Sequence, residues 1–173
     1  SATSEFAVDL AARHGEPIVS ANALQPRDAY RRLIDRYREQ YAAHGHDLAV
    51  AIDVIHATDA TGIDEKEVGS HPFGSGPVIG RGSTLSPKVY ELLRETAERN
   101  EIKYSVGASG NSTHTDADSL QISRTGIPTG LVSIPLRYMH SPVEMVDLAD
   151  VEATVSLMVA FAESLDPAVD LTR

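Results

Sequence analysis

The sequence of 173 residues contains no cysteine and no long apolar run. Without cysteine, disulfides and thiolate metal sites are excluded, so His, Asp and Glu are the only strong metal ligands that remain. No segment approaches membrane-spanning length, and no signal-peptide pattern opens the chain. These absences predict a cytoplasmic protein with no membrane partner.

Positive charge is also scarce. The chain has 15 Lys and Arg residues against 25 Asp and Glu residues, a formal net charge of −10. Nothing forms a long basic stripe, so nucleic acid is not expected as a partner. Hydrophobic residues make up 42 % and charged residues 23 %, an ordinary globular composition in a chain long enough for one domain with a core.

Short apolar runs alternate with helical periodicity through most of the chain. The runs predict strands over residues 48–54, 77–80, 104–106 and 131–134, of which the first reads as a buried parallel strand. Helices are predicted from Ser86-Pro87 and from Asp150, which caps the last one. Their apolar stripes are Val89, Leu92, Leu93, Ala97 and Val151, Val155, Met158, Ala162, Leu165. Together the pattern predicts a layered α/β/α domain around a mostly parallel sheet.

The domain boundary is expected near residue 47. Residues 1–47 form an N-terminal segment in which Tyr30, Leu33, Tyr37 and Tyr41 predict an amphipathic helix over about residues 27–43. Residues 48–173 are expected to form the domain proper. Within it, residues 57–76 are predicted to be a long loop, of the kind that is functional or disordered.

Ligand and catalytic sites of parallel sheets gather at the C-terminal ends of the strands. Three polar segments are predicted to lie there: Asp53–Asp59, His114–Asp118 and Arg137–Glu144. A carboxylate inside an apolar strand is costly unless it is paired or bound to metal. Asp53 is therefore interpreted either as a metal ligand or as one half of a buried ion pair.

Other candidate residues have a structural and a functional interpretation. His140 follows a predicted strand, and Glu144 is a candidate to orient its imidazole, although a structural histidine is the alternative. Gly76 belongs to a glycine-rich turn that either enters a strand or lines a substrate cleft. This turn lacks the Gly-Lys-Ser/Thr of a nucleotide loop. His114 and Asp116 belong either to a site or to a polar loop.

Four stretches together resemble the tetrahedral and glutamyl aminopeptidase family of two-metal metallopeptidases, whose members are also called endoglucanases and deblocking aminopeptidases. They are AIDVIHATDATGI at 51–63, GSGPVIGRG at 74–82, the run ending in RYMHSPVE at 113–144, and the helix after it. Their order and spacing match over about residues 48–165. The resemblance implies the C-terminal part of a catalytic domain with a truncated phosphorylase/hydrolase-like zinc-peptidase architecture.

The resemblance also implies the chemistry. Members of the family remove N-terminal residues from peptide substrates with two divalent ions, zinc or cobalt, and commonly form homo-oligomers. By position Asp53 resembles the carboxylate ligand of one metal, and His140 resembles the histidine ligand of the other. The substrate cleft and the groups behind the ligands would then include Asp116, His114, Arg137, Glu144 and Gly76.

Part of the family's metal site has no counterpart. The family carries a first histidine, a bridging aspartate and a Glu-Glu pair with the general base upstream, but this sequence contains no Glu-Glu or Asp-Asp dipeptide. His46-Asp47 mimics a ligand motif but lies too late in the chain. A catalytic zinc needs about three protein ligands, so weak metal binding is expected unless a second chain completes the site. A catalytically inactive homologue with a structural or assembly role is the alternative.

Overall fold

The computed structural model describes residues 48–123, 126–165 and 171. The described residues belong to the compact unit Leu48–Arg173. The predicted helix at about residues 27–43 and the His46-Asp47 pair lie outside the described residues. Within these ranges, no helix has both the length and the apolar character needed to cross a bilayer.

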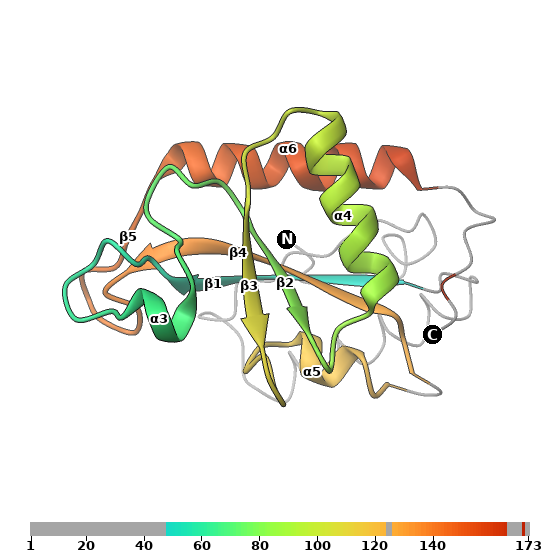
Figure 1. The fold of residues 1–173 in the computed structure, drawn as a ribbon, viewed down its shortest axis with the longest axis horizontal. Coiled ribbons are helices and arrows are strands. Elements are labelled where there is room, and N and C mark those ends of the chain that lie inside the picture. The colour runs from blue at the N-terminus through green and yellow to red at the C-terminus, as the bar shows by residue number, and fades with distance from the viewer. Residues whose placement is uncertain (1–47, 124–125, 166–170, 172–173) are drawn as a thin grey trace, which may run out of the picture. The chain divides into compact units, whose positions relative to one another are not determined.

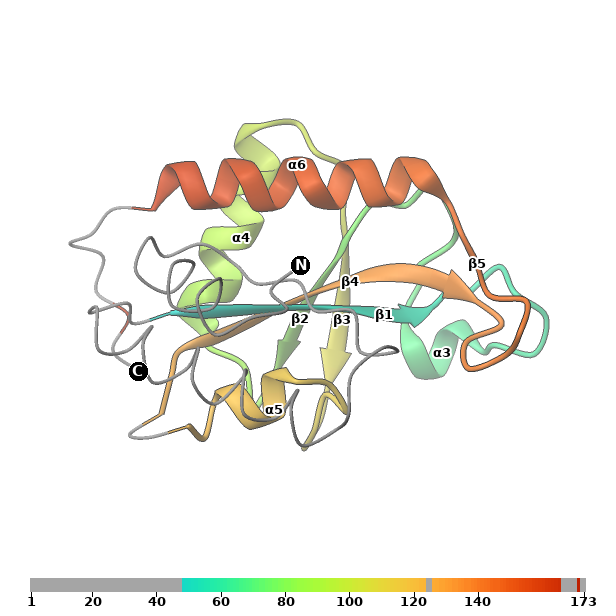
Figure 2. The same cartoon turned by 180° about the vertical axis from the view of Figure 1, so that it is seen from behind.

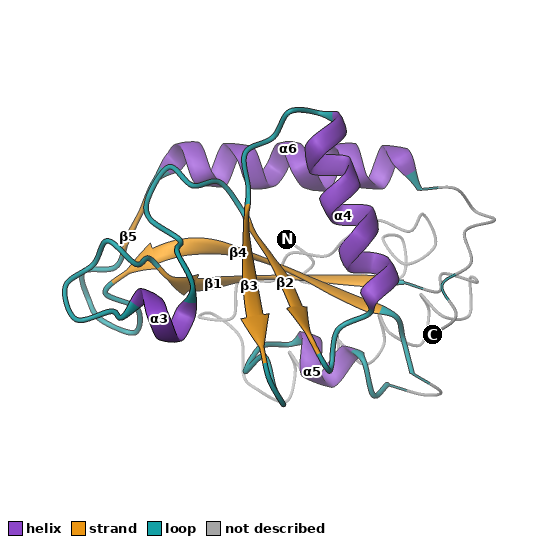
Figure 3. Cartoon of the chain, viewed as in Figure 1, coloured by secondary structure: helices purple, strands orange, loops and turns teal. Residues whose placement is uncertain are grey.

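Strands and helices alternate along the described chain, as the sequence predicts (Figures 1 and 3). The predicted loop over residues 57–76 contains one additional short helix, α3. The elements are β1 Ala49–His56, α3 Glu65–Val68, β2 Val78–Gly82, α4 Pro87–Arg99, β3 Ser105–Ser109, α5 Ala117–Leu120, β4 Thr129–Arg137, β5 Met145–Val146 and α6 Leu148–Ser164.

The strands form one mixed sheet in the order β1-β4-β2-β3, with β5 paired to β4. β1 and β4 are parallel over their length, with Asp53 opposite Ser133 and His56 opposite Leu136. β2 and β3 are also parallel, but β2 runs antiparallel to β4. The α/β class with a mostly parallel sheet is confirmed. β2 and β3 cross β1 and β4 at a steep angle, so their C-terminal ends lie near α5 and away from the C-terminal ends of β1 and β4 (Figure 1).

Helices α4 and α6 cover one face of the sheet, and the short helix α5 lies on the other (Figures 1 and 2). The larger core cluster lies beneath α4 and α6; its members include Ile79, Val89, Leu93, Val132, Leu157 and Phe161. The smaller cluster, on the α5 face, consists of Ala51, Leu85, Ala117 and Leu131. Asp53 lies two residues beyond Ala51 on β1, so the side chains of both point to the α5 face.

Helix α4 begins as predicted. Ser86 is the N-cap residue, its hydroxyl accepts a hydrogen bond from the Val89 amide, and Pro87 occupies the first helical position. Val89, Leu93 and Ala97 are fully buried. The predicted stripe is therefore the face that packs on the sheet.

Two details of helix α6 differ from the prediction. Its N-cap is Asp147, whose carboxylate accepts a 2.9 Å hydrogen bond from the Ala149 amide, so Asp150 does not cap the helix. The buried side is made of Asp150, Thr154, Leu157 and Phe161, whereas Val155 of the predicted stripe is 57 % exposed. Apolar residues surround most of this helix, so periodicity alone does not select the face that packs.

Strand β1 was predicted to be buried, and this is wrong for the described structure. It is the outermost strand of the described sheet. Ala51 is buried, but Ile52 is 47 % and Val54 36 % exposed. The run is apolar on both faces, which predicts a strand buried on both faces. The other described residues bury Ala51 but leave Ile52 and Val54 exposed.

Candidate functional site

Asp53 lies in an unusual place for a charged side chain, within the apolar strand β1. One carboxylate oxygen, Oδ1, accepts a 2.8 Å hydrogen bond from the amide of the next residue, Val54. None of the ion pairs among the described residues involves Asp53. The buried ion pair that was one alternative is therefore absent from the described part of the chain. Asp53 is only half-buried and its hydrogen bond to Val54 is exposed, so water also stabilises this carboxylate, and its role as a metal ligand stays a prediction.

His140 lies in the turn that follows β4. The chain leaves β4 at Arg137 and returns as β5, which places Met145 opposite Arg137. Tyr138 and His140 both adopt left-handed backbone conformations, with φ of 59° and 63°. Such a conformation costs a non-glycine residue about 1–2 kcal/mol, and it persists only where the surrounding contacts enforce it.

Glu144 provides one of those contacts. Its Oε1 accepts a 2.6 Å hydrogen bond from the backbone amide of His140. The sequence suggested that Glu144 orients the imidazole, but in the structure it holds the backbone. The turn is therefore fixed by a carboxylate at its base, while the exposed imidazole makes no hydrogen bond within the described residues.

Arg137 joins the end of β4 to the loop after β1. Its guanidinium donates from Nε to Asp59 Oδ1 at 3.1 Å and from Nη2 to Oδ2 at 2.5 Å. It also lies over the Phe73 ring, 4.1 Å from the ring centroid, and the Phe73 amide donates to Asp59. The hydrogen bond from Arg137 lowers the pKa of the Asp59 carboxyl. This Arg137 clamp, composed of Arg137, Asp59 and Phe73, fixes the strand end that precedes His140.

The segment His114–Asp118 does not lie at the predicted end of the sheet, because β3 runs antiparallel to β4. Its last residues nevertheless lie on the face of the sheet that carries Asp53, because α5 packs there. Ala117 at the start of α5 packs in one cluster with Ala51 and Leu131. This places exposed Asp116 on the same face of the sheet as Asp53, and its side chain makes no capping hydrogen bond.

Asp118 organises this loop. Its carboxylate accepts hydrogen bonds from the Ser112 hydroxyl at 2.6 Å, the Thr113 amide at 3.0 Å and the His114 amide at 2.9 Å. Burial by itself raises the pKa of Asp118, but these hydrogen bonds outweigh it and lower the pKa to about 2. His114 is exposed and left-handed, with φ of 56°. The polar-loop interpretation therefore accounts for Asp118.

Gly76 lies at a close approach between two backbones. Its φ is 79°, and a Cβ there would lie 1.9 Å from the carbonyl oxygen of Lys103. The amides of Gly74 and Gly76 donate to the Asp150 carboxylate at 2.9 and 2.7 Å. The turn thus binds the first turn of α6, a contact that the sequence did not predict. The cleft interpretation of Gly76 stays a prediction.

His71 is a second contact that sequence reasoning missed. Its side chain is buried, its Nδ1 lies 2.8 Å from the Ser105 hydroxyl, and its Nε2 lies 2.9 Å from the Val68 carbonyl oxygen. Burial lowers the pKa of the imidazole. Both ring nitrogens are occupied, so His71 fixes the long loop to β3. No sequence pattern marked it, because both partners are distant or backbone groups.

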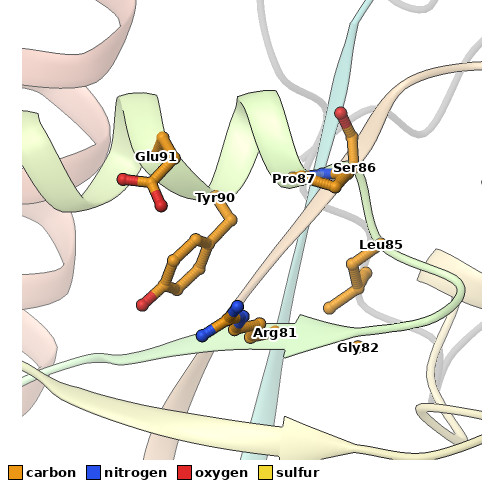
Figure 4. A pocket seen from close by; sticks show the side chains of 7 residues that line it. All are labelled: Arg81, Gly82, Leu85, Ser86, Pro87, Tyr90 and Glu91. Atoms are coloured by element: carbon orange, nitrogen blue, oxygen red, sulfur yellow. The ribbon is translucent and has the colours of Figure 1, made fainter. Parts of the chain in front are cut away.

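A small hollow of about 180 Å³ lies between β2 and the start of α4 (Figure 4). Arg81 lies over the ring of Tyr90, 5.6 Å from its centroid. Ser86, which also lines the hollow, already accepts from the Val89 amide. The hollow contains none of the predicted site residues.

The donors for a metal ion are incomplete in the part of the chain that the structure describes. There, no group of three or more His, Cys, Asp or Glu side chains is arranged to hold an ion. Asp53, on β1, offers a carboxylate, and His140, in the turn after the neighbouring strand β4, offers an imidazole; both are suitable zinc donors. Two donors do not make a catalytic centre, so the described residues alone do not fit one.

Comparison with known proteins shows which class of protein this chain resembles. The lysyl aminopeptidase of Pyrococcus furiosus is 38 % identical over 121 residues, which are 70 % of this chain and 34 % of that protein. A solved aminopeptidase of the archaeon Desulfurococcus kamchatkensis is 39 % identical with a TM-score of 0.62, over 70 % of this chain and 35 % of that chain. The TET1 peptidase of Pyrococcus horikoshii is 27 % identical with a TM-score of 0.54, over 72 % and 36 %. The class is that of the aminopeptidases.

The family model described as M42 glutamyl aminopeptidase matches residues 39–157. The chain belongs to this family, and the resemblance found in the four sequence stretches is confirmed. The chain spans about a third of the length of the relatives it matches.

Proposed function

We propose that this chain is the part of a metallo-aminopeptidase catalytic unit that supplies Asp53 and His140 to a site for two divalent ions, zinc or cobalt. With the remaining ligands present, the unit removes N-terminal residues from peptides. The observation that carries the proposal is the parallel pairing of β1 with β4 in a member of the M42 family. The two strands run in the same direction, one bearing Asp53 and the other leading into His140.

The neighbouring residues have positioning roles in this proposal. The Val54 amide holds one oxygen of Asp53 and leaves the other available. Glu144 fixes the backbone of His140, and the Arg137 clamp fixes the end of β4. Asp116, His114 and Gly76 are assigned to the substrate cleft. Asp116 is supported by its place on the face that Asp53 shares.

The proposal includes assembly. The TET1 peptidase of Pyrococcus horikoshii can assemble into a tetrahedron or a large octahedral shell. By analogy we assign this chain to a homo-oligomeric, cytoplasmic enzyme, in which a second polypeptide completes each metal site.

A non-catalytic role is the second candidate, and a specific observation favours it. The described residues contain no third metal donor beside Asp53 and His140, and the sequence contains no Glu-Glu pair to supply a general base. A chain of this kind would retain the fold and serve as a structural or assembly partner.

Hydrolysis of fluorogenic aminoacyl-coumarin amides, measured during zinc or cobalt titration, separates the two candidates. Loss of groups behind metal ligands typically costs about 10–100-fold in activity, so we expect Asp53→Ala and His140→Ala to lose at least about a hundredfold of the turnover that a completed site supports. Glu95→Ala, which removes an exposed carboxylate of α4, is the control and should keep full turnover. A completed site without turnover favours the structural role.

A further inference from the structure

His71 is a buried imidazole to which the proposed function assigns no role. Only 1 % of the residue is exposed. Its Nε2 lies 2.9 Å from the Val68 carbonyl oxygen, which can only accept, so Nε2 carries the proton and donates. Nδ1 then accepts from the Ser105 hydroxyl at 2.8 Å. The neutral ring therefore joins the end of α3, in the long loop 57–76, to strand β3.

The backbone of His71 is paired with Thr58, two residues after the end of β1. The Thr58 amide donates to the His71 carbonyl oxygen at 3.1 Å, and the His71 amide donates to the Thr58 hydroxyl at 2.9 Å. The same hydroxyl donates to the Glu65 carboxylate of α3 at 3.2 Å. His71 therefore connects three places at once: β3, α3 and the chain that leaves β1.

The Arg137 clamp is built on this pairing. Asp59 follows Thr58 directly, and Phe73 lies two residues after His71. The Phe73 amide donates to Asp59 at 3.2 Å, and Arg137 contacts both side chains. Figures 1 and 2 show α3 and its loop beside the ends of β1 and β4. A continuous series of contacts thus runs from the imidazole to Arg137, where β4 ends and the turn at residues 138–144 begins.

A proton on the His71 ring opposes this arrangement. The charged ring would still find an acceptor in Ser105, because a hydroxyl both donates and accepts, but a buried charge loses its hydration. Burial lowers the pKa of His71 below 6.5 more than the Val68 hydrogen bond and the Glu65 carboxylate raise it. Opening of the loop returns the ring to water, so acid favours the open loop.

We propose that His71 is a pH-dependent latch that controls the mobility of the turn at residues 138–144. At neutral pH the latch holds the loop 57–76 on β3 and keeps the Arg137 clamp closed, which fixes the turn. When the ring takes a proton, the loop separates from β3 and the turn becomes mobile. His71 is thereby a positioning residue for His140. The consequence for a metal donor rests on the proposed function, whereas the latch itself does not.

Hydrogen-exchange mass spectrometry of the full 173-residue chain between pH 7.5 and 5.5 tests the latch, with rates corrected for the intrinsic effect of pH on exchange. Protonation of one group favours opening by at most about tenfold per pH unit. Protection of residues 138–144 should therefore fall severalfold, up to about tenfold, and residues 64–71 should lose protection in parallel. Both segments should exchange faster than the core helix α4 at every pH, because local opening requires less free energy than global unfolding.

Two variants separate the latch from the contacts that transmit its effect. His71→Gln keeps a donor and an acceptor but takes no proton, so the fall with pH should disappear; every other titratable group is shared with wild type. In Arg137→Lys the loop should still lose protection in acid, while the turn should be poorly protected at every pH. Arg94→Lys, on the surface of α4, is the matched control and should respond as wild type does. Circular dichroism melts verify that each variant folds.

Three results would overturn the proposal: protection of the turn that does not change with pH, the same fall in His71→Gln as in wild type, or exchange of the turn at the rate of α4, which would mean that only global unfolding releases it. The latch and the chemistry can fail separately. A pH-dependent turn in a chain whose completed site hydrolyses no substrate supports the latch and contradicts the proposed function. A pH-independent turn beside an active site contradicts the latch and supports the proposed function.

Discussion

Asp150 joins two parts of the chain that lie 74 and 76 residues apart. Only 1 % of the residue is exposed, and its two carboxylate oxygens are occupied by the Gly76 and Gly74 amides. A buried amide that loses its acceptor costs about 1–3 kcal/mol. The packing of α6 against the loop before β2 therefore depends on one side chain.

We expect Asp150→Ala to lower the free energy of unfolding by about 2–3 kcal/mol, because the buried Gly76 amide would lose its acceptor, whereas the exposed Gly74 amide would bond to water. Asp147→Ala removes the N-cap of the same helix and should cost only about 1 kcal/mol. Urea denaturation of the two variants measures the difference. Equal losses would show that the Gly74–Gly76 turn does not hold α6.

His71 gives the fold a dependence on pH whose sign is fixed by burial. Burial lowers the pKa of the folded imidazole below its usual value of 6.5. The neutral imidazole therefore contributes fully to the stability of the fold above the unfolded pKa. This contribution is lost as the pH falls below about 6.5 toward the lower pKa of the folded state. One such group changes the free energy of unfolding by at most about 1.4 kcal/mol per pH unit.

We expect wild-type stability to fall between pH 7.5 and 5, and His71→Gln to show a smaller fall from a lower starting stability. Ser119→Ala, at an exposed residue that does not titrate, is the control and should keep the wild-type slope. Urea midpoints measured at several pH values in the three proteins provide the comparison. A His71→Gln slope equal to that of wild type would contradict the assignment.

At the scale of elements, the Arg137 clamp connects β1, β4 and the long loop. Its two hydrogen bonds and its stacking on Phe73 require a planar guanidinium, which lysine does not provide. Arg94 is a matched comparison, since it pairs with Glu91 and Glu98 along one side of α4. Ion pairs of that surface kind contribute little.

Arg137→Lys should therefore lower the thermal midpoint more than Arg94→Lys does. It should also speed hydrogen exchange in residues 138–144, because the strand end that anchors the turn is loosened. Hydrogen-exchange mass spectrometry on both variants tests this. Unchanged exchange in that segment would show that the turn around His140 is independent of the clamp.

The elements themselves were largely predictable from sequence. Ser86-Pro87 marked the start of α4, and the apolar runs marked β1 to β4, because capping and periodicity are local properties. The direction of β2 was not predictable, since no local pattern records that it runs antiparallel to β4. The buried side of α6 was missed because apolar residues cover nearly all of it. Both errors concern packing between distant segments.

At the scale of the whole molecule, only those candidate site residues that lie within sequence motifs could be predicted from the sequence. The four stretches identified the M42 family, and the assignment of Asp53 and His140 as metal ligands is a prediction from their positions within those stretches. The clamp between Arg137 and Asp59, and the contacts of Asp150 and His71, join residues far apart in sequence. Their partners are set by the tertiary fold and leave no spacing that sequence analysis could detect.

Our central proposal is that Asp53 and His140 are two donors of a metal site that the described residues alone do not complete. Zinc retained by the purified 173-residue chain after desalting, measured by mass spectrometry, tests it most directly. We expect far less than one zinc per chain, since about three protein ligands are needed for firm binding. Two zinc ions per chain, lost in Asp53→Ala and His140→Ala, would contradict it.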